Sequence, residues 1–448
     1  MKSFSIGGVH PAENKLSHKV EISQMELPLK VCIPLAQHIG APATAIVAKG
    51  DEVVTGQLIA EATGFMSANI HSTITGKVTS VVPMASAQGL MTPMVVIERK
   101  AEDEEKWAEG VDLSTELVRE CSLEPQQIIE RIKAAGIVGM GGATFPTHVK
   151  LSIPPAKRAE ILIINGVECE PYLTSDHRTM LARGEELMVG VEIVMRAIGV
   201  DQAVIGIESN KPDAINHLTK IAKKYNGIKV APLKVKYPQG GEKQLIEAIT
   251  GREVPPPPAL PIDVGAVVVN VSTALAIYEA VQKGKPLVER VVTVSGKSVT
   301  NPINVMSRFG VATSELLKAA GGLPEDTTKV IGGGPMMGRA VVNLDSPVTK
   351  GSSGITIMGG ADGVRAVASN CIKCGKCVSA CPMSLEPYLL SKLMQRSAME
   401  QLEAGNVTDC IECGSCQFTC PAQLPLLDYI RLGKQRVMGI IRARSIAK

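Results

Sequence analysis

The chain has 448 residues, which corresponds to about three domains of ordinary size. Hydrophobic residues make up 45% and charged residues 20%, a balance that supports packed cores and excludes bulk disorder. The net charge of +3 argues against a nucleic-acid-binding protein that relies on bulk positive charge. The sequence shows no secretory leader and no uncharged apolar run of membrane-spanning length, so we expect a chain without a transmembrane span.

Residues 1–105 are expected to form a small β-barrel or sandwich, because short β-segments alternate with Gly and Pro. These segments are Val31–Leu35, Ala45–Ala48, Gln57–Ala60 and Gly76–Val82. The stretch from Gly50 to Val78 resembles lipoyl and biotinyl domains, in which a hairpin presents a modified lysine. The corresponding stretch Glu61–Ser67 has no lysine. We therefore expect an unmodified structural or docking domain, followed by a charged linker at 101–120.

Residues 120–287 alternate between helical and strand patterns, which predicts βαβ units and a mainly parallel, Rossmann-like α/β sheet. The expected helices are Gln126–Ala135, Glu185–Ile198 and Asp213–Tyr225, and the expected strands are Ile161–Asn165, Ala203–Ile207, Val230–Val235 and Ala266–Val271. Residues 288–348 contain β-rich runs and one helix, Ser314–Ala320, and have the size of a small α+β module. Residues 365–428 are expected to form short helices around cysteines.

Eight of the eleven cysteines form two runs with the spacing C-x2-C-x2-C-x3-C-P. This is the pattern of bacterial two-cluster ferredoxins, in which the fourth Cys of each run ligates the other cluster. One [4Fe–4S] cluster is therefore expected on Cys371, Cys374, Cys377 and Cys420, and the second on Cys410, Cys413, Cys416 and Cys381. The alternative is a pair of structural zinc sites, which this double run disfavours because zinc sites usually separate two CxxC units by a longer loop.

Four glycines lie between Gly136 and Thr147, in a loop that exposes backbone N–H groups to a phosphate or flat ring. The loop is neither a Walker A motif nor the usual dinucleotide fingerprint, since a helix precedes it. About twenty residues later, the strand Ile161–Asn165 runs into an acidic segment with Glu168 and Glu170. The carboxyl ends of parallel strands are where α/β sheets bind ligands. A solvated loop remains the alternative for both carboxylates.

These motifs resemble the flavoprotein subunit of respiratory complex I. The segment Gly139–Lys150 is similar to that subunit's FMN loop, and Asn165–Pro171 to its Asn-x-x-Glu-x-Glu-Pro segment. Gly240-Gly241-Glu242 and the pair Asn270 and Thr273 resemble two further segments of the same subunit. Met140 departs from the pattern, because arginine usually stands there in complex I. The contact with the FMN phosphate must then be supplied by another residue.

The whole chain is more similar to the RnfC family, the peripheral subunits of the Rnf complex. The similarity includes the opening Gly7-Gly8-Val9-His10-Pro11, the glycine-rich loop, the segment Glu168–Leu173 and the ferredoxin module. It implies four domains: an N-terminal barrel-sandwich hybrid, an FMN/NADH-binding α/β domain, a soluble-ligand-binding β-grasp domain at 288–348 and a helical two-[4Fe–4S] ferredoxin-type domain. It also implies two [4Fe–4S] clusters, FMN and NAD(H) as cofactors.

The resemblance further implies ion-translocating ferredoxin:NAD+ oxidoreduction at the cytoplasmic face of the cell membrane. The expected partners are the other Rnf subunits, NADH and, indirectly, ferredoxin, and no nucleic acid. By position, the FMN site comprises Gly139, Gly141, Gly142, Phe145, Lys150, Asn165, Glu168, Glu170, Asn270 and Thr273. Glu168 and Glu170 are the expected catalytic residues that position the nicotinamide. FMN belongs between NADH and the clusters, because flavin exchanges both hydride and single electrons.

Two other functions share part of this pattern. A cobalamin reductase of bacterial microcompartments would have the same loop and two-cluster module, although Ala143-Thr144-Phe145 favours RnfC. An electron-transfer scaffold with a vestigial flavin site is the non-enzyme alternative. The segment 429–448 carries six basic residues and no acidic one, and without them the body of the chain has 41 basic and 44 acidic residues. This tail is expected to be either a solvated basic helix or a docking segment.

Overall fold

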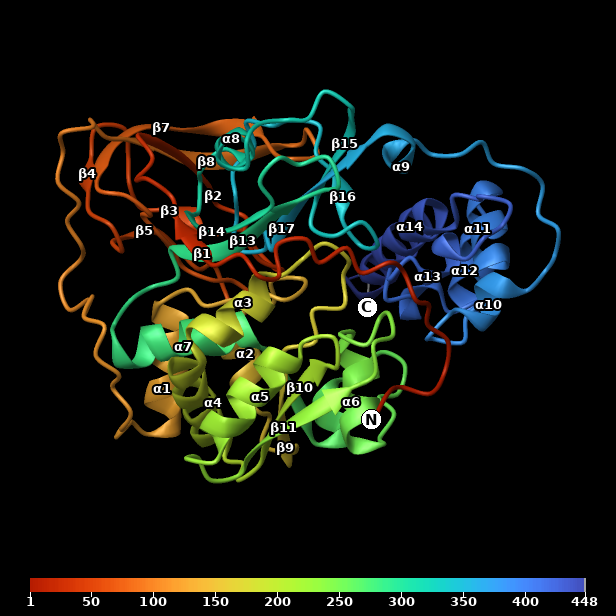
Figure 1. Cartoon of the computed structure of the whole chain (residues 1–448), viewed down its shortest axis with the longest axis horizontal. Helices are drawn as coiled ribbons and strands as arrows, with labels where there is room; N and C mark the ends of the chain where they lie inside the picture. The colour runs from red at the N-terminus through yellow and green to blue at the C-terminus, as the bar shows by residue number, and fades with distance from the viewer. Residues whose placement is uncertain (447–448) are drawn as a thin grey trace.

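The computed structural model describes residues 1–446, and Figure 1 shows the ferredoxin module set to one side of the other domains. The first domain contains two small antiparallel sheets, in line with the expected barrel-sandwich class. Buried Val31, Ile33, Ile59, Val95 and Ile97 fill the space between them. One sheet has the order β2 (Lys30–Pro34), β8 (Met91–Glu98), β7 (Gly76–Ala85), β4 (Glu52–Val53), and the other β3 (Thr44–Ala45), β5 (Leu58–Glu61), β6 (Ile70–His71).

The second domain is built on a four-stranded, fully parallel sheet, which confirms the expected α/β class. Its order is β11 (Ile228–Leu233), β10 (Ala203–Glu208), β9 (Ile161–Asn165), β12 (Ala266–Asn270). Alternate residues of β9 belong to two different cores, Leu162 and Ile164 to one and Ile163 to the other. Helices therefore cover both faces of the sheet: α1 (Pro125–Ala134), α2 (Thr147–Leu151), α3 (Ser175–Ala182), α4 (Gly184–Ile198), α5 (Pro212–Ala222), α6 (Glu242–Thr250), η1 (Pro261–Val264) and α7 (Val271–Gln282).

The third sheet extends beyond the range 288–348 at both ends. Its order is β1 (Ile22–Gln24), β14 (Ile303–Arg308), β13 (Glu289–Ser295), β17 (Gly354–Gly359), β15 (Thr327–Gly332), β16 (Arg339–Ala340), with α8 (Thr313–Ala319) and α9 (Gly360–Gly363). Strand β1 comes from the N-terminal segment and pairs with β14, whereas β17 pairs with both β13 and β15. A strand from near the N-terminus therefore forms one edge of a sheet whose other strands come from residues 289–359.

The ferredoxin module has a hydrophobic core of its own, which includes Leu390, Met394, Leu402, Ile430 and Val437. Its helices are α10 (Lys376–Ser379), α11 (Pro387–Gln395), α12 (Met399–Ala404), η2 (Val407–Asp409), α13 (Ser415–Phe418) and α14 (Leu426–Ile446). An exposed segment, 364–370, connects it to the β-grasp sheet (Figure 1). No helix within residues 1–446 is long and apolar enough to cross a membrane.

Helix α14 contains most of the basic tail, while Lys448 lies outside the described residues. Three of its basic side chains pair within the domain. Arg431 contacts Glu412 at 3.1 Å, Lys434 donates to the Cys410 carbonyl at 2.6 Å, and Arg444 bonds Glu403. Arg431 and Lys434 therefore secure the second cysteine loop, a role that neither expectation for the tail included.

Candidate flavin and iron–sulfur site

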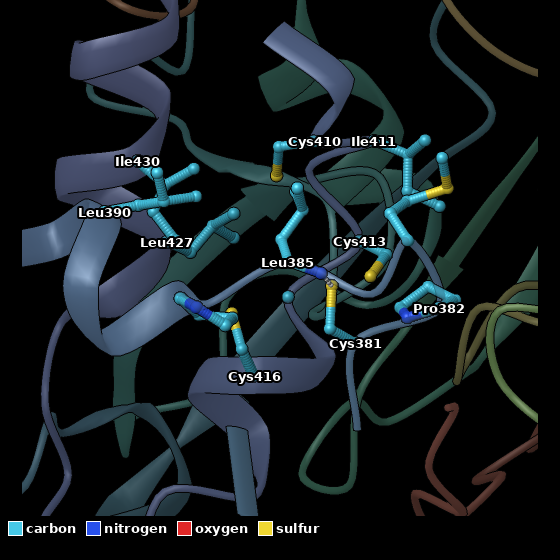
Figure 2. A pocket seen from close by; sticks show the side chains of 13 residues that line it. Cys381, Pro382, Leu385, Leu390, Cys410, Ile411, Cys413, Cys416, Leu427 and Ile430 are labelled. Atoms are coloured by element: carbon cyan, nitrogen blue, oxygen red, sulfur yellow. Dashed lines mark hydrogen bonds between the residues drawn. The ribbon is translucent and has the colours of Figure 1, made fainter. Parts of the chain in front are cut away.

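One cavity of the ferredoxin module is lined by four cysteines drawn from both runs: Cys381, Cys410, Cys413 and Cys416. Figure 2 shows these four side chains around a common space, with Leu390, Leu427 and Ile430 on its left side. The remaining lining is apolar and includes Leu385, Leu390, Leu427 and Ile430. Cys381 reaches this cavity because the turn after α10 crosses to the second run, as the expected exchange of fourth ligands requires.

The chemistry of these thiols fits an iron–sulfur cluster. Burial raises the pKa of Cys410 to about 12 and also raises the pKa of Cys381, Cys413 and Cys416. Buried thiols with raised pKa values ionise only against a strong positive charge, which the iron of a cluster supplies. Within residues 1–446, no three His, Cys, Asp or Glu side chains are arranged to hold a single metal ion.

The other four cysteines also draw on both runs. Burial raises the pKa of Cys377, and a charge on Cys420 adds to that effect, so the two thiols lie near each other. Cys420 is buried, Cys371 and Cys377 are half-buried, and Cys374 is exposed. The set on the outer side of the module is therefore more accessible to solvent than the set that lines the cavity.

The residues expected to bind FMN gather where β9 and β12 end. The Met140 N–H donates to the Thr273 hydroxyl at 2.9 Å, which fastens the glycine-rich loop to the first turn of α7. Asn270 caps that helix, with its side-chain oxygen accepting from the Ser272 and Thr273 N–H groups. A Cβ at Gly141 would lie 2.6 Å from the Asn270 amide nitrogen, so only glycine permits this approach. Beside it, Gly142 is exposed and faces open space.

The segment after β11 completes this group. The Asn165 amide donates to the Gly240 carbonyl at 2.8 Å, and the Lys150 ammonium bonds Glu242 at 2.7 Å. Gln239, fully buried beside Gly240, has neither its oxygen nor its nitrogen hydrogen-bonded within the described part of the chain. The unpaired Gln239 amide beside Gly240, together with the Lys150 cation, fits a ligand that has ring polar atoms and a phosphate. Phe145 is half-buried in the same loop.

Met140 is buried, and its side chain lies in the core. An arginine from β13 contacts its backbone instead. Arg290, itself buried, donates to the Met140 carbonyl at 3.1 Å and to the Lys350 carbonyl at 2.6 Å. Burial lowers the pKa of Arg290 to about 10, although Asp176 and Glu168 lie close enough to raise it in part. A buried guanidinium from the β-grasp domain thus supports the loop at the position where complex I has an arginine.

Both candidate catalytic carboxylates already have hydrogen-bond partners. Glu168 accepts from the Asp176 and His177 N–H groups and from the Ser175 hydroxyl, so it caps α3. Glu170 accepts from the Met336 and Met337 N–H groups at 3.1 and 2.7 Å. Burial raises the pKa of Glu170 to about 7. Contact of either carboxylate with a nicotinamide stays a prediction.

Tyr237, which the sequence patterns did not single out, connects the two halves of the site. Its buried hydroxyl donates to the Cys413 carbonyl at 2.8 Å and lies 3.4 Å from Glu170. The link therefore runs from Cys413, one of the four cavity-lining cysteines that form the inner set, to the acidic segment after β9. A tyrosine followed by Pro-Gln-Gly-Gly carried no recognisable signal, because its partner is 176 residues away.

The N-terminal segment covers the same junction, and Figure 1 shows it passing between the ferredoxin module and the second domain. The Gly8 N–H donates to the Ala380 carbonyl, and a Cβ at Gly7 would lie 2.6 Å from the Cys381 backbone. The Lys15 ammonium donates to the carbonyls of Glu168, Glu170 and Leu173. The Gly7-Gly8 pair entered the sequence analysis only as part of the family resemblance, and the fold shows that it contacts the backbone at Ala380 and Cys381.

Four family models match consecutive parts of the chain. They are the RnfC barrel sandwich hybrid domain (residues 3–102), the Nuo51 FMN-binding domain (132–279), the SLBB domain (291–340) and the 4Fe-4S dicluster domain (363–421). This order agrees with the four-domain fold class expected from the sequence. The fold and the site define a component of an oxidoreductase that combines FMN-binding and two-cluster iron–sulfur domains.

Three relatives match nearly the whole of this chain. It is 46% identical to the C subunit of the proton-translocating ferredoxin:NAD(+) oxidoreductase complex of Clostridium ljungdahlii, over 96% of this chain and 93% of that protein. It is 43% identical to the C subunit of the Na(+)-translocating complex of Acetobacterium woodii, over 96% of each. The C subunit of the ion-translocating oxidoreductase complex of Pseudomonas aeruginosa is 39% identical, over 98% of this chain and 56% of the relative. The chain belongs to the RnfC family, the C subunits of ion-translocating oxidoreductase complexes.

Proposed function

We propose that this chain exchanges hydride with NAD(H) at FMN and single electrons through two [4Fe–4S] clusters, as a peripheral subunit of an ion-translocating ferredoxin:NAD+ oxidoreductase at the cytoplasmic face of the membrane. The other subunits of that complex are its partners, and ferredoxin is reached through them. Membership of the RnfC family supports this function over cobalamin reduction and over a scaffold without flavin.

The observation that carries the proposal is the link between the two halves of the site through Tyr237. Its contacts with the Cys413 carbonyl and with Glu170 support the proposal, because they join one of the cavity-lining cysteines to the acidic segment beside the candidate FMN residues. We therefore assign the inner cluster, on Cys381, Cys410, Cys413 and Cys416, to the position next to the flavin. The outer cluster, on Cys371, Cys374, Cys377 and Cys420, is assigned to the far end of the relay.

The chain's own residues hold and shield the cofactors. The loop at Gly139, Gly141 and Gly142, together with Asn165, Asn270 and Thr273, provides backbone and amide groups for FMN, and Phe145 provides an apolar edge. Lys150 balances negative charge on the flavin or its phosphate. When bound, FMN supplies the exchange between hydride and single electrons. Glu168 and Glu170 hold the surrounding loop in shape and are assigned to the nicotinamide side of the site.

An anaerobic absorption spectrum tests this function. The full chain, reconstituted with FMN and iron and sulfide, should show bleaching of the flavin band on addition of NADH, followed by loss of cluster absorbance. Lys150→Gln should weaken FMN binding about tenfold, equivalent to about 1.4 kcal/mol. Lys157→Gln is the matched control, because Lys157 pairs with Asp263 at the surface. No bleaching in the reconstituted wild type would contradict the NADH role.

A further inference from the structure

The loop that carries the outer cysteines is exposed over five consecutive residues, 372–376. The loop at the corresponding positions of the second run, 411–415, is buried or half-buried. The middle ligands show the same difference, since Cys374 is exposed while Cys413 is only 7% exposed. One cluster loop therefore faces solvent, although the two runs have identical spacing.

Two large apolar side chains next to the outer cysteines are exposed. Ile372, next to Cys371, is 67% exposed, whereas Ile411 at the equivalent position of the second run is half-buried. Phe418, two residues before Cys420, is 52% exposed. Ile372 and Phe418 thus lie within two residues of cysteines assigned to the outer cluster, and we call the surface around them the rim of that cluster. Exposed apolar residues grouped at one functional site are typical of a surface that another protein covers.

The loop itself carries charge of one sign, while the exposed Glu386 follows it, near Cys371 and Cys377. Residues 363–385 include three basic residues and no acidic one. Arg365 pairs with Asp428, but Lys373 and Lys376 form no ion pair within residues 1–446. The equivalent of Lys373 in the second run is Glu412, which is paired with Arg431 and Lys434. The outer loop thus presents two unpaired ammonium groups beside its apolar residues.

We propose that this face, formed by Ile372, Lys373, Lys376 and Phe418, is the docking surface for a redox protein with an acidic face and a one-electron centre. This inference rests on the proposed function, in which the outer cluster ends the relay. One electron passes between the cluster and the partner's centre without a bond being formed or broken, and two such transfers match one hydride. The lysines steer the acidic partner, and the apolar pair excludes water from a small, transient interface.

The experiment uses the full chain reconstituted with its cofactors and, as probe, a purified acidic two-[4Fe–4S] ferredoxin, which stands in for the acidic redox subunit through which ferredoxin is reached in the complex. Carbodiimide should crosslink ferredoxin carboxylates to Lys373 or Lys376, as identified by peptide mass spectrometry. Lys373→Glu/Lys376→Glu should lose these adducts and take electrons from reduced ferredoxin about tenfold more slowly at low salt. The difference should shrink as salt rises. Electron transfer to cytochrome c, a basic protein, should instead become faster.

Lys49→Glu/Lys100→Glu is the matched control, because it makes the same charge change at exposed positions of the first domain. Ile372→Gln tests the apolar contact, and its slower transfer should persist at high salt. Adducts that map elsewhere, or equal rates for the two double variants, would overturn the proposal. The proposal would also be overturned if the rim variants kept ferredoxin binding but lost binding to anionic vesicles. The same holds if they kept ferredoxin binding but lost self-association. Bleaching by NADH is recorded in the same samples, so failure of the proposed function is seen separately.

Discussion

The two cysteine runs have the same spacing, and the same proline follows each fourth cysteine, yet their surroundings differ. The loop 411–415 packs against Tyr237, Met336 and helix α14, while the loop 372–376 faces solvent. Glu412 is neutralised by Arg431 and Lys434, whereas Lys373 is unpaired within the described residues. The same pattern of cysteines is thus buried from solvent at the loop 411–415 and exposed to solvent at the loop 372–376. The local dielectric and the access of solvent, which tune the reduction potential of clusters with the same ligands, therefore differ between the two clusters.

The strongest test of this contrast is to remove one ligand of each set. Cys416→Ser should abolish the inner cluster and stop electron flow from NADH to the outer one, because the relay loses its middle member. Cys374→Ser should remove only the outer cluster and leave reduction of the flavin and the inner cluster intact. Iron content and low-temperature electron paramagnetic resonance after NADH addition measure both effects. Equal loss of internal electron transfer in the two variants would reverse or abolish the assigned order.

The buried carboxyl next to the inner loop should make stability depend on pH. The pKa of Glu170 is raised from 4.5 to about 7, so the folded state holds its proton more tightly than the unfolded state. Its contribution to stability is fully present below pH 4.5 and is lost as pH rises towards 7, an effect on the order of 3 kcal/mol.

Glu170→Gln should remove this contribution, since glutamine does not titrate. The free energy of unfolding, measured with urea at pH 5 and pH 8, should therefore fall less between these pH values for the variant than for the wild type. Parallel profiles for the two proteins would show that the carboxyl does not keep its proton in the folded state.

A more modest effect is expected for Tyr237→Phe, which removes the hydroxyl that joins the second domain to the inner cluster loop. The Cys413 carbonyl would lose a buried donor, at a cost of about 1–3 kcal/mol. Internal electron transfer from flavin to cluster should also slow, as followed by stopped-flow absorbance. Tyr388→Phe is the control, because the Tyr388 hydroxyl meets Glu386 at the surface. Indistinguishable melting temperatures for the two variants would argue against a structural link.

The weakest effect concerns the N-terminal segment. Gly7 and Gly64 have similar positive φ angles, 68° and 79°, so alanine costs about 1 kcal/mol of backbone strain at either position. Only Gly7→Ala also brings a Cβ against the Cys381 backbone, while Gly64 faces open space. Gly7→Ala should therefore loosen the segment beside the inner cluster and speed its proteolysis. Equal cleavage of the two variants would show that this contact does not hold the segment.

Local patterns were sufficient for much of the fold. The strand Ile161–Asn165 has the expected bounds, and the helix expected at Glu185–Ile198 begins one residue earlier. Periodicity and the Gly at the end of that helix determine these elements locally. Strands β1 and β17 were missed, since a three-residue ladder and a strand after an irregular loop depend on distant partners. The β-grasp sheet is consequently larger than its expected range.

The domain classes, the cluster chemistry and the candidate ligand cysteines are readable in the sequence of this protein, because thiolate spacing and glycine positions are local requirements of cofactor binding. The fold was needed to show which cluster loop is buried, and that Tyr237, Lys15 and Arg290 take part in the site. These features depend on contacts between segments up to hundreds of residues apart, whose burial and charge a local motif does not encode. The tail shows the same division: its charge is visible in the sequence, but its pairing with Glu412 and the Cys410 carbonyl is not.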